Sequence, residues 1–384
     1  MIYKEFKGIT ISHLGMGNMR LPTTGPGGLR APIDRGKAQE IIDYVYANGV
    51  NYFDTAYMYH GGESERFLGE ALKKYPRESY LLADKMWGML VQQGRPTADV
   101  FEEQLRRCQT DYFDFYLLHN VSESTIDIYM DEKLGILDDL LEQKRTGRIR
   151  NLGLSSHGKP ATLKRFIERW HCFDFVQIQL NYLDWTLQDA KGQYEVITEH
   201  GMPVWVMEPC RGGRLASLSP EADEVLKKAN PNASIASWAF RYLQTLPNVQ
   251  VVLSGMTQME QAVDNIRTFA HPNPLTEEEQ KALEQAVRLL KERLNVPCTK
   301  CRYCDGCPKG LDIPELLAMY NELCIDRGGA LMIALGNMQG EKKPANCVAC
   351  GQCAKKCPQN IDIPGIMSKF AETLAKMPPT ALPR

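Results

Sequence analysis

Short apolar runs alternate with amphipathic segments over the first three quarters of the chain. The runs of mostly apolar residues that have the length of strands lie at residues 11–17, 50–55, 80–85, 113–119, 149–155, 173–180, 204–209 and 249–255. Segments with helical spacing of apolar positions lie between them, among others at residues 35–47, 63–73, 97–108, 133–146, 161–170, 234–244 and 258–269. Because parallel strands need crossover connections, this alternation predicts a parallel sheet covered by helices.

Two folds share this alternation. Eight strand and helix units in about 250 residues have the length of a (β/α)8 barrel. A doubly wound open sheet would instead have a glycine-rich phosphate loop after its first strand, and Gly15-Met-Gly-Asn-Met-Arg lacks the third glycine. We therefore predict an α/β protein in which residues 1–275 form a TIM barrel. Residues 276–384 form a second, smaller domain. It begins with a helix at residues 276–294, which leads off the barrel.

The composition is that of a globular protein. Of the 384 residues, 43% are hydrophobic and 24% charged, and 45 basic against 47 acidic side chains give a net charge of −2. This balance argues against nucleic-acid binding, which needs clustered basic residues. The N-terminal sequence MIYKEFKGIT has no apolar leader, and no run approaches the roughly 18 apolar residues of a membrane span. We expect a cytoplasmic protein without a membrane span.

Eight of the twelve cysteines are concentrated in two short runs near the C-terminus. The first run is Cys298, Cys301, Cys304 and Cys307, followed by proline, and the second is Cys347, Cys350, Cys353 and Cys357, also followed by proline. A disulfide scaffold would instead spread its cysteines through a short secreted chain. The chain therefore has two chemically distinct regions.

The second run has the C-x2-C-x2-C-x3-C-P spacing of bacterial ferredoxins, in which the fourth cysteine binds the other cluster. The first run is one residue shorter before its last cysteine. We predict two 4Fe-4S clusters, one held by Cys298, Cys301, Cys304 and Cys357 and the other by Cys347, Cys350, Cys353 and Cys307. Paired zinc sites are the alternative, although zinc ribbons usually place two cysteines on each of two knuckles.

The segment between the two runs is long for a compact hairpin ferredoxin. It holds 39 residues and a helical pattern at residues 314–325. In this respect the region resembles the helical two-cluster ferredoxin modules of multi-subunit redox enzymes. The resemblance implies a mainly helical, ferredoxin-like C-terminal domain.

The predicted strand ends carry polar residues that apolar strands do not otherwise explain. Asp54 ends the second strand with Tyr57 and Tyr59 just beyond it, Lys85 ends the third, and His119 ends the fourth. In a barrel these ends gather on the face where catalytic residues lie. A tyrosine has a pKa of about 10, so it needs a nearby ammonium to be an effective proton donor at neutral pH. The set suits polarising a carbonyl while a hydride arrives.

These residues lie in three segments that resemble the catalytic sequences of the aldo-keto reductase family. The segments are Asn51-Tyr-Phe-Asp-Thr-Ala-Tyr-Met-Tyr-His-Gly-Gly-Glu-Ser-Glu, Ala83-Asp-Lys and Phe113-Asp-Phe-Tyr-Leu-Leu-His. The similarity extends over roughly the first 270 residues. It implies that Asp54, Tyr59, Lys85 and His119 are the family's catalytic tetrad, and that Tyr57 forms a wall of the substrate pocket.

The resemblance also implies NADP(H) or NAD(H) bound without a Rossmann fold. The matching segments begin at Gly153 and Val176 for the nicotinamide, at Pro209 for the pyrophosphate and at Ser254 for the adenosine. The cofactor-binding residues implied by position are Ser155, Ser156, Gln177, Asn181, Met207, Pro209, Gly213, Leu215, Gly255, Thr257, Gln261 and Asn265.

Two departures from the family pattern leave the preference between NADP and NAD open. Met207 stands where a tyrosine often stacks on the nicotinamide, and sulfur is a weaker stacking surface. Met256 and Thr257 follow Gly255 where an arginine or lysine would bind a 2′-phosphate. Arg211 and Arg214 are candidates to reach a phosphate instead.

The combination of barrel and clusters resembles iron-sulfur aldo-keto reductases. It implies an NAD(P)-dependent oxidoreductase that interconverts a small-molecule carbonyl and alcohol. Nicotinamide transfers two electrons as a hydride whereas each cube accepts one, and no flavin-binding fingerprint is visible. The clusters would therefore exchange electrons with a partner protein, a ferredoxin or flavoprotein, or would only stabilise the structure. In the alternative function, the chain is an electron-transfer subunit whose barrel binds a nucleotide without carbonyl turnover.

Overall fold

The computed structural model describes residues 1–25, 31–123, 125–292, 296, 298, 304–325, 335–336, 338–357 and 361–377. They group into two compact units, the first comprising Met1–Ala216 and Asn232–Gln280, the second Ser217–Pro231 and Lys281–Arg384. The second unit thus includes one stretch that lies within the barrel's part of the sequence. The division into domains at residues 275 and 276 stays a prediction.

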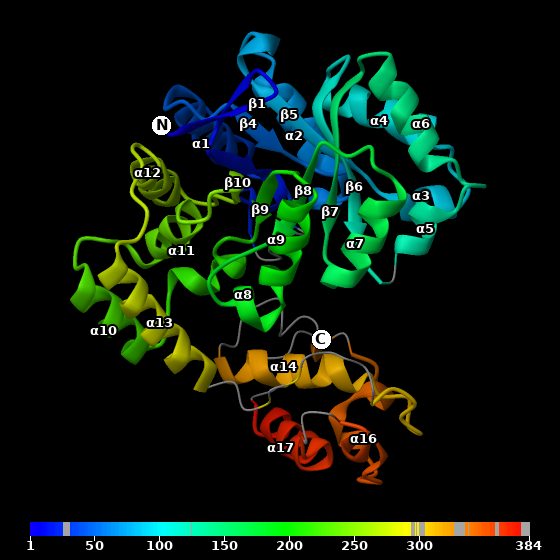
Figure 1. The fold of residues 1–384 in the computed structure, drawn as a ribbon, viewed down its shortest axis with the longest axis vertical. Coiled ribbons are helices and arrows are strands. Elements are labelled where there is room, and N and C mark those ends of the chain that lie inside the picture. The colour runs from blue at the N-terminus through cyan, green and yellow to red at the C-terminus, as the bar shows by residue number, and fades with distance from the viewer. Residues whose placement is uncertain are drawn as a thin grey trace. The chain divides into compact units, whose positions relative to one another are not determined.

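The first unit is a closed barrel, as the sequence predicted. In the part of the chain that the structure describes, eight strands follow one another around the barrel in the order β10-β3-β4-β5-β6-β7-β8-β9, and neighbouring strands pair in parallel (Figure 1). The strands are β3 (Leu14–Gly17), β4 (Tyr52–Asp54), β5 (Leu81–Met86), β6 (Phe113–Val121), β7 (Ile149–Ser156), β8 (Phe175–Gln179), β9 (Val204–Met207) and β10 (Val249–Ser254).

Helices connect the strands and cover the barrel. Side-chain hydrogen bonds fix the first turn of some of them, as where the Asp34 carboxylate accepts from the Lys37 N–H at the start of α1. The helices of this unit are α1 (Arg35–Ala47), α2 (Glu63–Leu72), α3 (Gly88–Gln92), α4 (Thr97–Cys108), α5 (Ile126–Met130), α6 (Ile136–Arg145), α7 (Pro160–Arg169), α8 (Asp184–Leu187), α9 (Ala190–Glu199), α11 (Ile235–Gln244) and α12 (Met259–Thr268). Short 3-10 turns are η1 (Asn18–Arg20), η3 (Tyr59–Gly62), η4 (Arg77–Ser79) and η5 (Arg211–Ala216).

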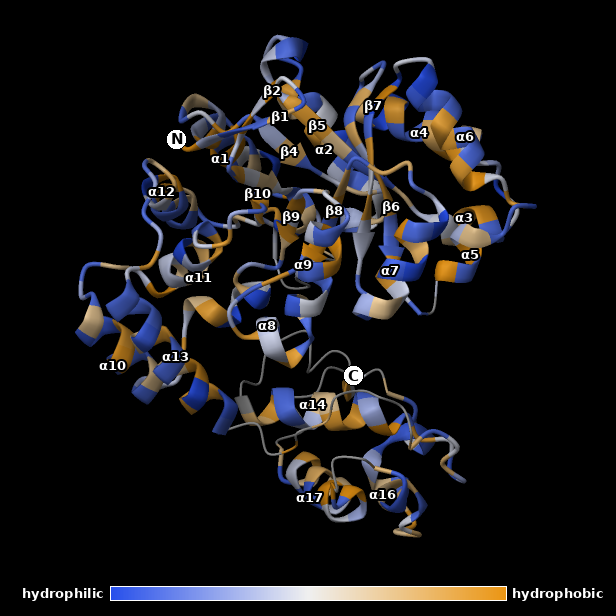
Figure 2. Cartoon of the chain, in the orientation of Figure 1, coloured by the Kyte–Doolittle hydropathy of each residue, from blue (hydrophilic) through white to orange (hydrophobic). Residues whose placement is uncertain are grey.

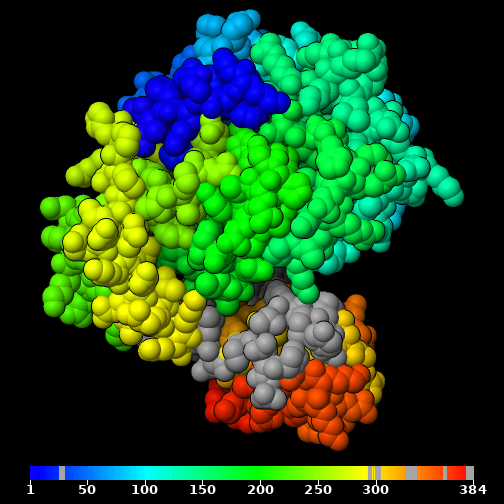
Figure 3. Space-filling model, viewed as in Figure 1, coloured from blue at the N-terminus to red at the C-terminus, as the bar shows by residue number. Residues whose placement is uncertain are grey.

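The apolar run at residues 11–17 is two strands, where the sequence predicted one. The first part belongs to β2 (Ile9–Ser12), which pairs antiparallel with β1 (Tyr3–Phe6), and only the part after His13 enters the barrel as β3. The N-terminal residues lie together on the surface of this unit (Figure 3, dark blue). Phe6 of the hairpin packs against Phe115 and Trp205, with ring centroids 5.9 and 5.3 Å apart. The hairpin therefore supplies part of the barrel's inner core.

Apolar side chains fill both the barrel and the layer around it. The inner cluster includes Tyr52, Phe115, Phe175 and Trp205, and strands β8 and β9 are largely apolar (Figure 2). A larger cluster joins the outer faces of the strands to the helices. A filled barrel is not a pore, so chemistry is confined to the loops at its C-terminal face.

Helices dominate the described part of the second unit. They are α10 (Pro220–Ala229), most of α13 (Glu277–Glu292), α14 (Ile313–Ile325), α16 (Gln352–Lys355) and α17 (Ile363–Ala375), with 3-10 turns η6 (Gly340–Lys342) and η7 (Pro344–Asn346). Helices α14 and α17 share an apolar core that includes Tyr320 and Phe370, whose rings lie 5.5 Å apart. Among the described residues, no helix has the length and apolar character needed to span a membrane.

Candidate active site and iron-sulfur site

Strand ends bring the four predicted catalytic side chains to one face of the barrel. Asp54 is the last residue of β4, Lys85 lies near the end of β5, and His119 lies in β6. Tyr59 follows β4 after a short loop and begins η3. The strands are neighbours in the order β4-β5-β6, so the four side chains meet above adjacent positions of the sheet.

Lys85 is the centre of this group. Its fully buried ammonium donates to Asp54 Oδ1 at 2.6 Å and to the Thr55 carbonyl at 2.7 Å. The same nitrogen lies 3.4 Å from the Tyr59 hydroxyl and 4.9 Å from the centre of the Tyr59 ring. A buried charge must be paired, and Asp54 pairs this one while leaving it in reach of the phenol.

Burial raises the pKa of Tyr59 above its usual value, and the Lys85 ammonium opposes this rise. The sequence led us to expect an acidic phenol, and the difference arises because desolvation of a phenolate outweighs one nearby positive charge. Burial would lower the pKa of Lys85, but Asp54 and Tyr59 together raise it above its usual value. At neutral pH the site therefore holds a protonated phenol beside a protonated amine.

His119 completes the group as a neutral imidazole. Burial, reinforced by the Lys85 charge, lowers the pKa of His119 well below its usual value. The His119 and Tyr59 rings are nearly perpendicular, with centroids 6.0 Å apart. Within the described residues, His119 Nδ1 is buried without a hydrogen-bond partner. A neutral imidazole with an unused nitrogen is suited to hydrogen bonding to a substrate.

The residues predicted to contact the nicotinamide lie next to one another on β7, β8 and β9. Ser155 is paired in register with Gln177, whose Nε2 donates to Met207 Sδ at 3.5 Å. Ser155 Oγ accepts from the Asn120 N–H at 2.8 Å, and Ser156 Oγ accepts from the Gly158 N–H at 3.4 Å. Gln177 Oε1 is buried and has no partner within the described part of the chain.

The predicted pyrophosphate loop follows β9 and contains Pro209, Gly213 and Leu215. Gly213 has φ +94°, which favours glycine, and no neighbouring atom lies within 4 Å of the position of a Cβ, while its N–H donates to the Cys210 carbonyl at 2.9 Å. Pro209 and Leu215 are buried and support the loop.

Two arginines beside this loop pair with carboxylates, and the reach of Arg211 or Arg214 to a phosphate stays a prediction. Arg211 Nε donates to Asp184 at 3.2 Å. Arg20 Nη2 donates to Glu208 Oε1 at 3.3 Å. The Arg20 side chain also lies 3.0 Å from the position of a Cβ on Gly255.

Other predicted cofactor residues are engaged in local hydrogen bonds. Gln261 Oε1 accepts from the Thr257 N–H at 2.8 Å, and Asn265 Nδ2 donates to Ser254 Oγ at 2.9 Å. Asn181 Nδ2 donates to Asp184 and to the Glu208 carbonyl, at 2.7 and 3.1 Å. Asn181 thus supports the turn after β9, and its predicted contact with the cofactor stays a prediction.

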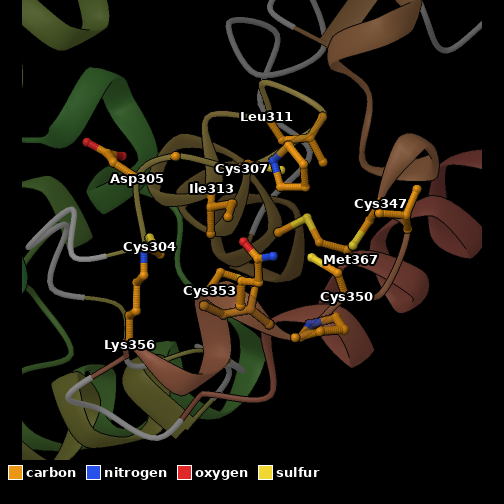
Figure 4. Close-up of a pocket in the computed structure, with 17 residues that line it drawn as sticks. Cys304, Asp305, Cys307, Leu311, Ile313, Cys347, Cys350, Cys353, Lys356 and Met367 are labelled. Carbon is orange, nitrogen blue, oxygen red and sulfur yellow. The ribbon is translucent and has the colours of Figure 1, made fainter.

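A small cavity that is open to solvent on one side lies in the second unit. All four residues predicted to hold the second cluster line it, namely Cys307, Cys347, Cys350 and Cys353 (Figure 4). Cys304 lines it as well, together with apolar residues such as Met367. Cys350 is exposed, so one wall of the cavity is close to solvent.

The ligands predicted for the first cluster are only partly described. Cys301 lies outside the described residues, while Cys298, Cys304 and Cys357 belong to or pack against the core of this unit. Within the described residues, no three His, Cys, Asp or Glu side chains stand close enough to hold a single metal ion. A cubane poses a different requirement because each of its thiolates binds a separate iron atom.

The structure also shows contacts that the sequence pattern did not reveal. Asp84 and Gln104 bond the main chain of Lys85 from outside the barrel. The sequence feature that could have indicated these contacts is Asp84, an acidic residue directly before Lys85 in a mostly apolar strand.

Comparisons with known families match the two regions separately. The model of the Aldo/keto reductase family matches residues 13–288. The model of a 4Fe-4S dicluster domain matches residues 297–361.

Individual proteins match over the barrel region. An oxidoreductase of Bacillus subtilis named YqkF is 28% identical over 308 residues, which cover 72% of this chain and 92% of that protein. L-galactose dehydrogenase of Arabidopsis thaliana is 25% identical over 282 residues, covering 67% and 84%. Among solved structures, the holo form of the aldo-keto reductase AKR11C1 from Bacillus halodurans has a TM-score of 0.61 at 28% identity, covering 74% of this chain and 96% of that one.

Proposed function

The chain belongs to the aldo/keto reductase family and is an NAD(P)-dependent oxidoreductase with a 4Fe-4S dicluster domain, and we propose that it interconverts a carbonyl and an alcohol with Tyr59 as general acid and base. The observation that supports this most is the position of Lys85. Its buried ammonium is bonded to Asp54 and lies 3.4 Å from the Tyr59 hydroxyl. This is the arrangement needed to stabilise a phenolate formed during proton transfer.

Each residue of the tetrad has one role in the reduction direction. Tyr59 donates its hydroxyl proton to the carbonyl oxygen, and its raised pKa keeps that proton in place at neutral pH. Lys85 stabilises the resulting phenolate, and Asp54 holds Lys85. Neutral His119 orients the substrate oxygen by a hydrogen bond. Tyr59 regains its proton from solvent, and in the oxidation direction the same steps run in reverse.

The nicotinamide, when bound, supplies or accepts the hydride. Gln177 provides the test of whether this barrel fits such a group, because its buried Oε1 has no partner among the described residues. A buried acceptor without a donor is costly, and a carboxamide N–H of the nicotinamide would satisfy it. Gly213, whose Cβ position has no neighbouring atom within 4 Å, lets a phosphate group approach the neighbouring loop closely. Turnover with NADPH compared with turnover with NADH distinguishes NADP(H) from NAD(H) as the cofactor.

We predict that Gln177→Leu weakens binding of the nicotinamide cofactor by about fivefold, because one buried hydrogen bond is lost at a cost of about 1 kcal/mol. The dissociation constant is measured by quenching of tryptophan fluorescence on adding NADPH or NADH. Gln250→Leu is the matched control, since that glutamine donates to the Glu5 carbonyl away from the predicted cofactor loops. Equal affinity of Gln177→Leu and the parent would contradict the assignment.

For the second unit, the proposal is one 4Fe-4S cube on Cys307, Cys347, Cys350 and Cys353 and another on Cys298, Cys301, Cys304 and Cys357. The cavity lined by the first four of these cysteines supports the first assignment. Cys350 and Val348 are exposed beside it, Val348 at 54% of its surface. An exposed edge of this kind favours electron exchange with a ferredoxin or flavoprotein over a purely structural role.

The function is tested by turnover under anoxic conditions that preserve the clusters. The full chain is supplied with NADPH or NADH and a panel of aldehydes, ketones and sugars, and loss of nicotinamide absorbance is followed. We expect oxidation of one cofactor with at least one carbonyl. Binding of NADPH or NADH without its oxidation by any member of the panel would favour the electron-transfer subunit instead.

A further inference from the structure

The main chain of Lys85 is not fixed by strand pairing alone. The ladder between β4 and β5 ends at the pair of Asp54 with Ala83, because the chain turns away after β4. Beyond that pair, two side chains form hydrogen bonds with the main chain of Lys85. Asp84 Oδ1 accepts from the Lys85 N–H at 2.8 Å, and Gln104 Nε2 donates to the Lys85 carbonyl at 3.1 Å.

Asp84 lies on the opposite side of β5 from the Lys85 side chain, as alternation along a strand requires. There it is fully buried between the strand and helices α2 and α4. The helices approach closely at Gly69, where a Cβ would lie 2.6 Å from the Cys108 carbonyl carbon. This approach brings Glu65 of α2 together with Gln104 and Arg107 of α4.

Glu65 is also fully buried, and both of its oxygens have donors. Gln104 Nε2 donates to Oε1 at 2.9 Å, and Arg107 Nη1 donates to Oε2 at 2.6 Å. The Gln104 amide is fixed at its other end by the Tyr116 hydroxyl, which donates to Oε1. Glu65 therefore has the surroundings of an ionised carboxylate.

Asp84 has different surroundings. Among the described residues no guanidinium bonds it, the Cys108 thiol lies 3.7 Å from its Oδ2, and its carboxyl is close enough to that of Glu65 for a hydrogen bond. Two ionised carboxylates only accept hydrogen bonds, so a bond between them requires a proton on one. Burial, reinforced by the Glu65 charge, raises the pKa of Asp84 well above its usual value.

We propose that Asp84 is a neutral carboxylic acid whose hydroxyl donates to Glu65, and that Asp84 and Gln104 together are positioning residues that hold the Lys85 main chain so that its ammonium faces Tyr59. The side-chain oxygens of Asp84, Glu65 and Gln104 then each have a partner of the right kind. Neutral Asp84 also adds no second negative charge beside Lys85, whose ammonium stays paired with Asp54.

The protonation state is tested by infrared spectroscopy on the full chain at about pH 8, roughly four units above the ordinary pKa of an aspartyl carboxyl. We expect the carbonyl stretch of a protonated carboxyl group, shifted in D2O and missing in Asp84→Asn. Asp114→Asn is the matched control, because Asp114 is equally buried but bonded by Arg77 and Arg150, and the band should remain. A band that survives in Asp84→Asn would overturn the proposal.

The positioning role rests on the proposed function and is tested separately, with NADPH or NADH and para-nitrobenzaldehyde. Asp84→Asn keeps an acceptor for Lys85 and a donor for Glu65, so we expect kcat within about threefold of the parent. Asp84→Ala keeps neither, and kcat should fall about 10- to 100-fold with KM for the cofactor little changed, since small displacements of catalytic groups cost this much. Gln104→Met provides a second route if Asp84→Ala does not fold.

Equal losses in Asp84→Asn and Asp84→Ala, or none in Asp84→Ala and Gln104→Met, would overturn the positioning role. A parent chain without turnover would count against the proposed function, while the infrared result would still decide the protonation state.

Discussion

Replacing Tyr59 by phenylalanine should abolish carbonyl reduction, with kcat falling by about 10³- to 10⁴-fold. The phenylalanine ring fills the same space but has no proton to donate, and general acid catalysis contributes up to this factor. Lys85 and Asp54 remain paired, so the buried charges stay satisfied and the fold should be unaffected. Steady-state turnover with the best carbonyl of the panel measures the effect, and cofactor binding should be unchanged.

Tyr75→Phe is the matched control for this prediction. The Tyr75 hydroxyl donates to Asp43 at 2.6 Å, at a helix surface rather than at the strand ends. It should leave kcat within about twofold, in line with a surface substitution. If Tyr59→Phe retained more than about a tenth of the parent kcat, another group would have to donate the proton.

The second large effect is expected on iron content. Cys350→Ala removes one predicted ligand of the second cluster, and because Cys350 is exposed, its truncation leaves the packing of the core unchanged. Iron and acid-labile sulfide should fall from about eight to about four of each per chain, because a cubane needs all its thiolates. Both are measured on anoxically purified protein, with the electron paramagnetic resonance spin count after reduction by dithionite.

Cys324→Ala controls for removing a cysteine from the same unit, since Cys324 lies in α14 and does not line the cavity. Its iron content should equal that of the parent. Undiminished iron in Cys350→Ala would exclude Cys350 as a ligand. Loss of all iron from a folded chain would contradict two separately held clusters.

The sequence predicted the barrel because parallel strands buried on both faces appear as short apolar runs. It did not reveal the break at His13, because no glycine or proline at residues 12 and 13 marks the change from hairpin to barrel strand. Periodicity alone assigns such a run to one strand.

The candidate catalytic residues were predictable for a similar reason, since Asp54, Lys85 and His119 stand out at the ends of apolar strands. The pKa of Tyr59 was not, because the degree of desolvation depends on packing that the residue order does not show. The partner of Arg211 was equally hidden, since Asp184 lies far from it in sequence and reaches it only through the fold.

Helix α10 has a consequence for shortening or exchanging parts of this protein. It is encoded between two stretches of the barrel, yet it groups with the iron-sulfur unit. A fragment ending at residue 280 would keep α10 while losing the rest of that unit, and its buried Ala222 and Leu226 show that this helix has an apolar face to cover. A recombination event that transferred only the C-terminal third of the gene would likewise leave this helix of the second unit behind.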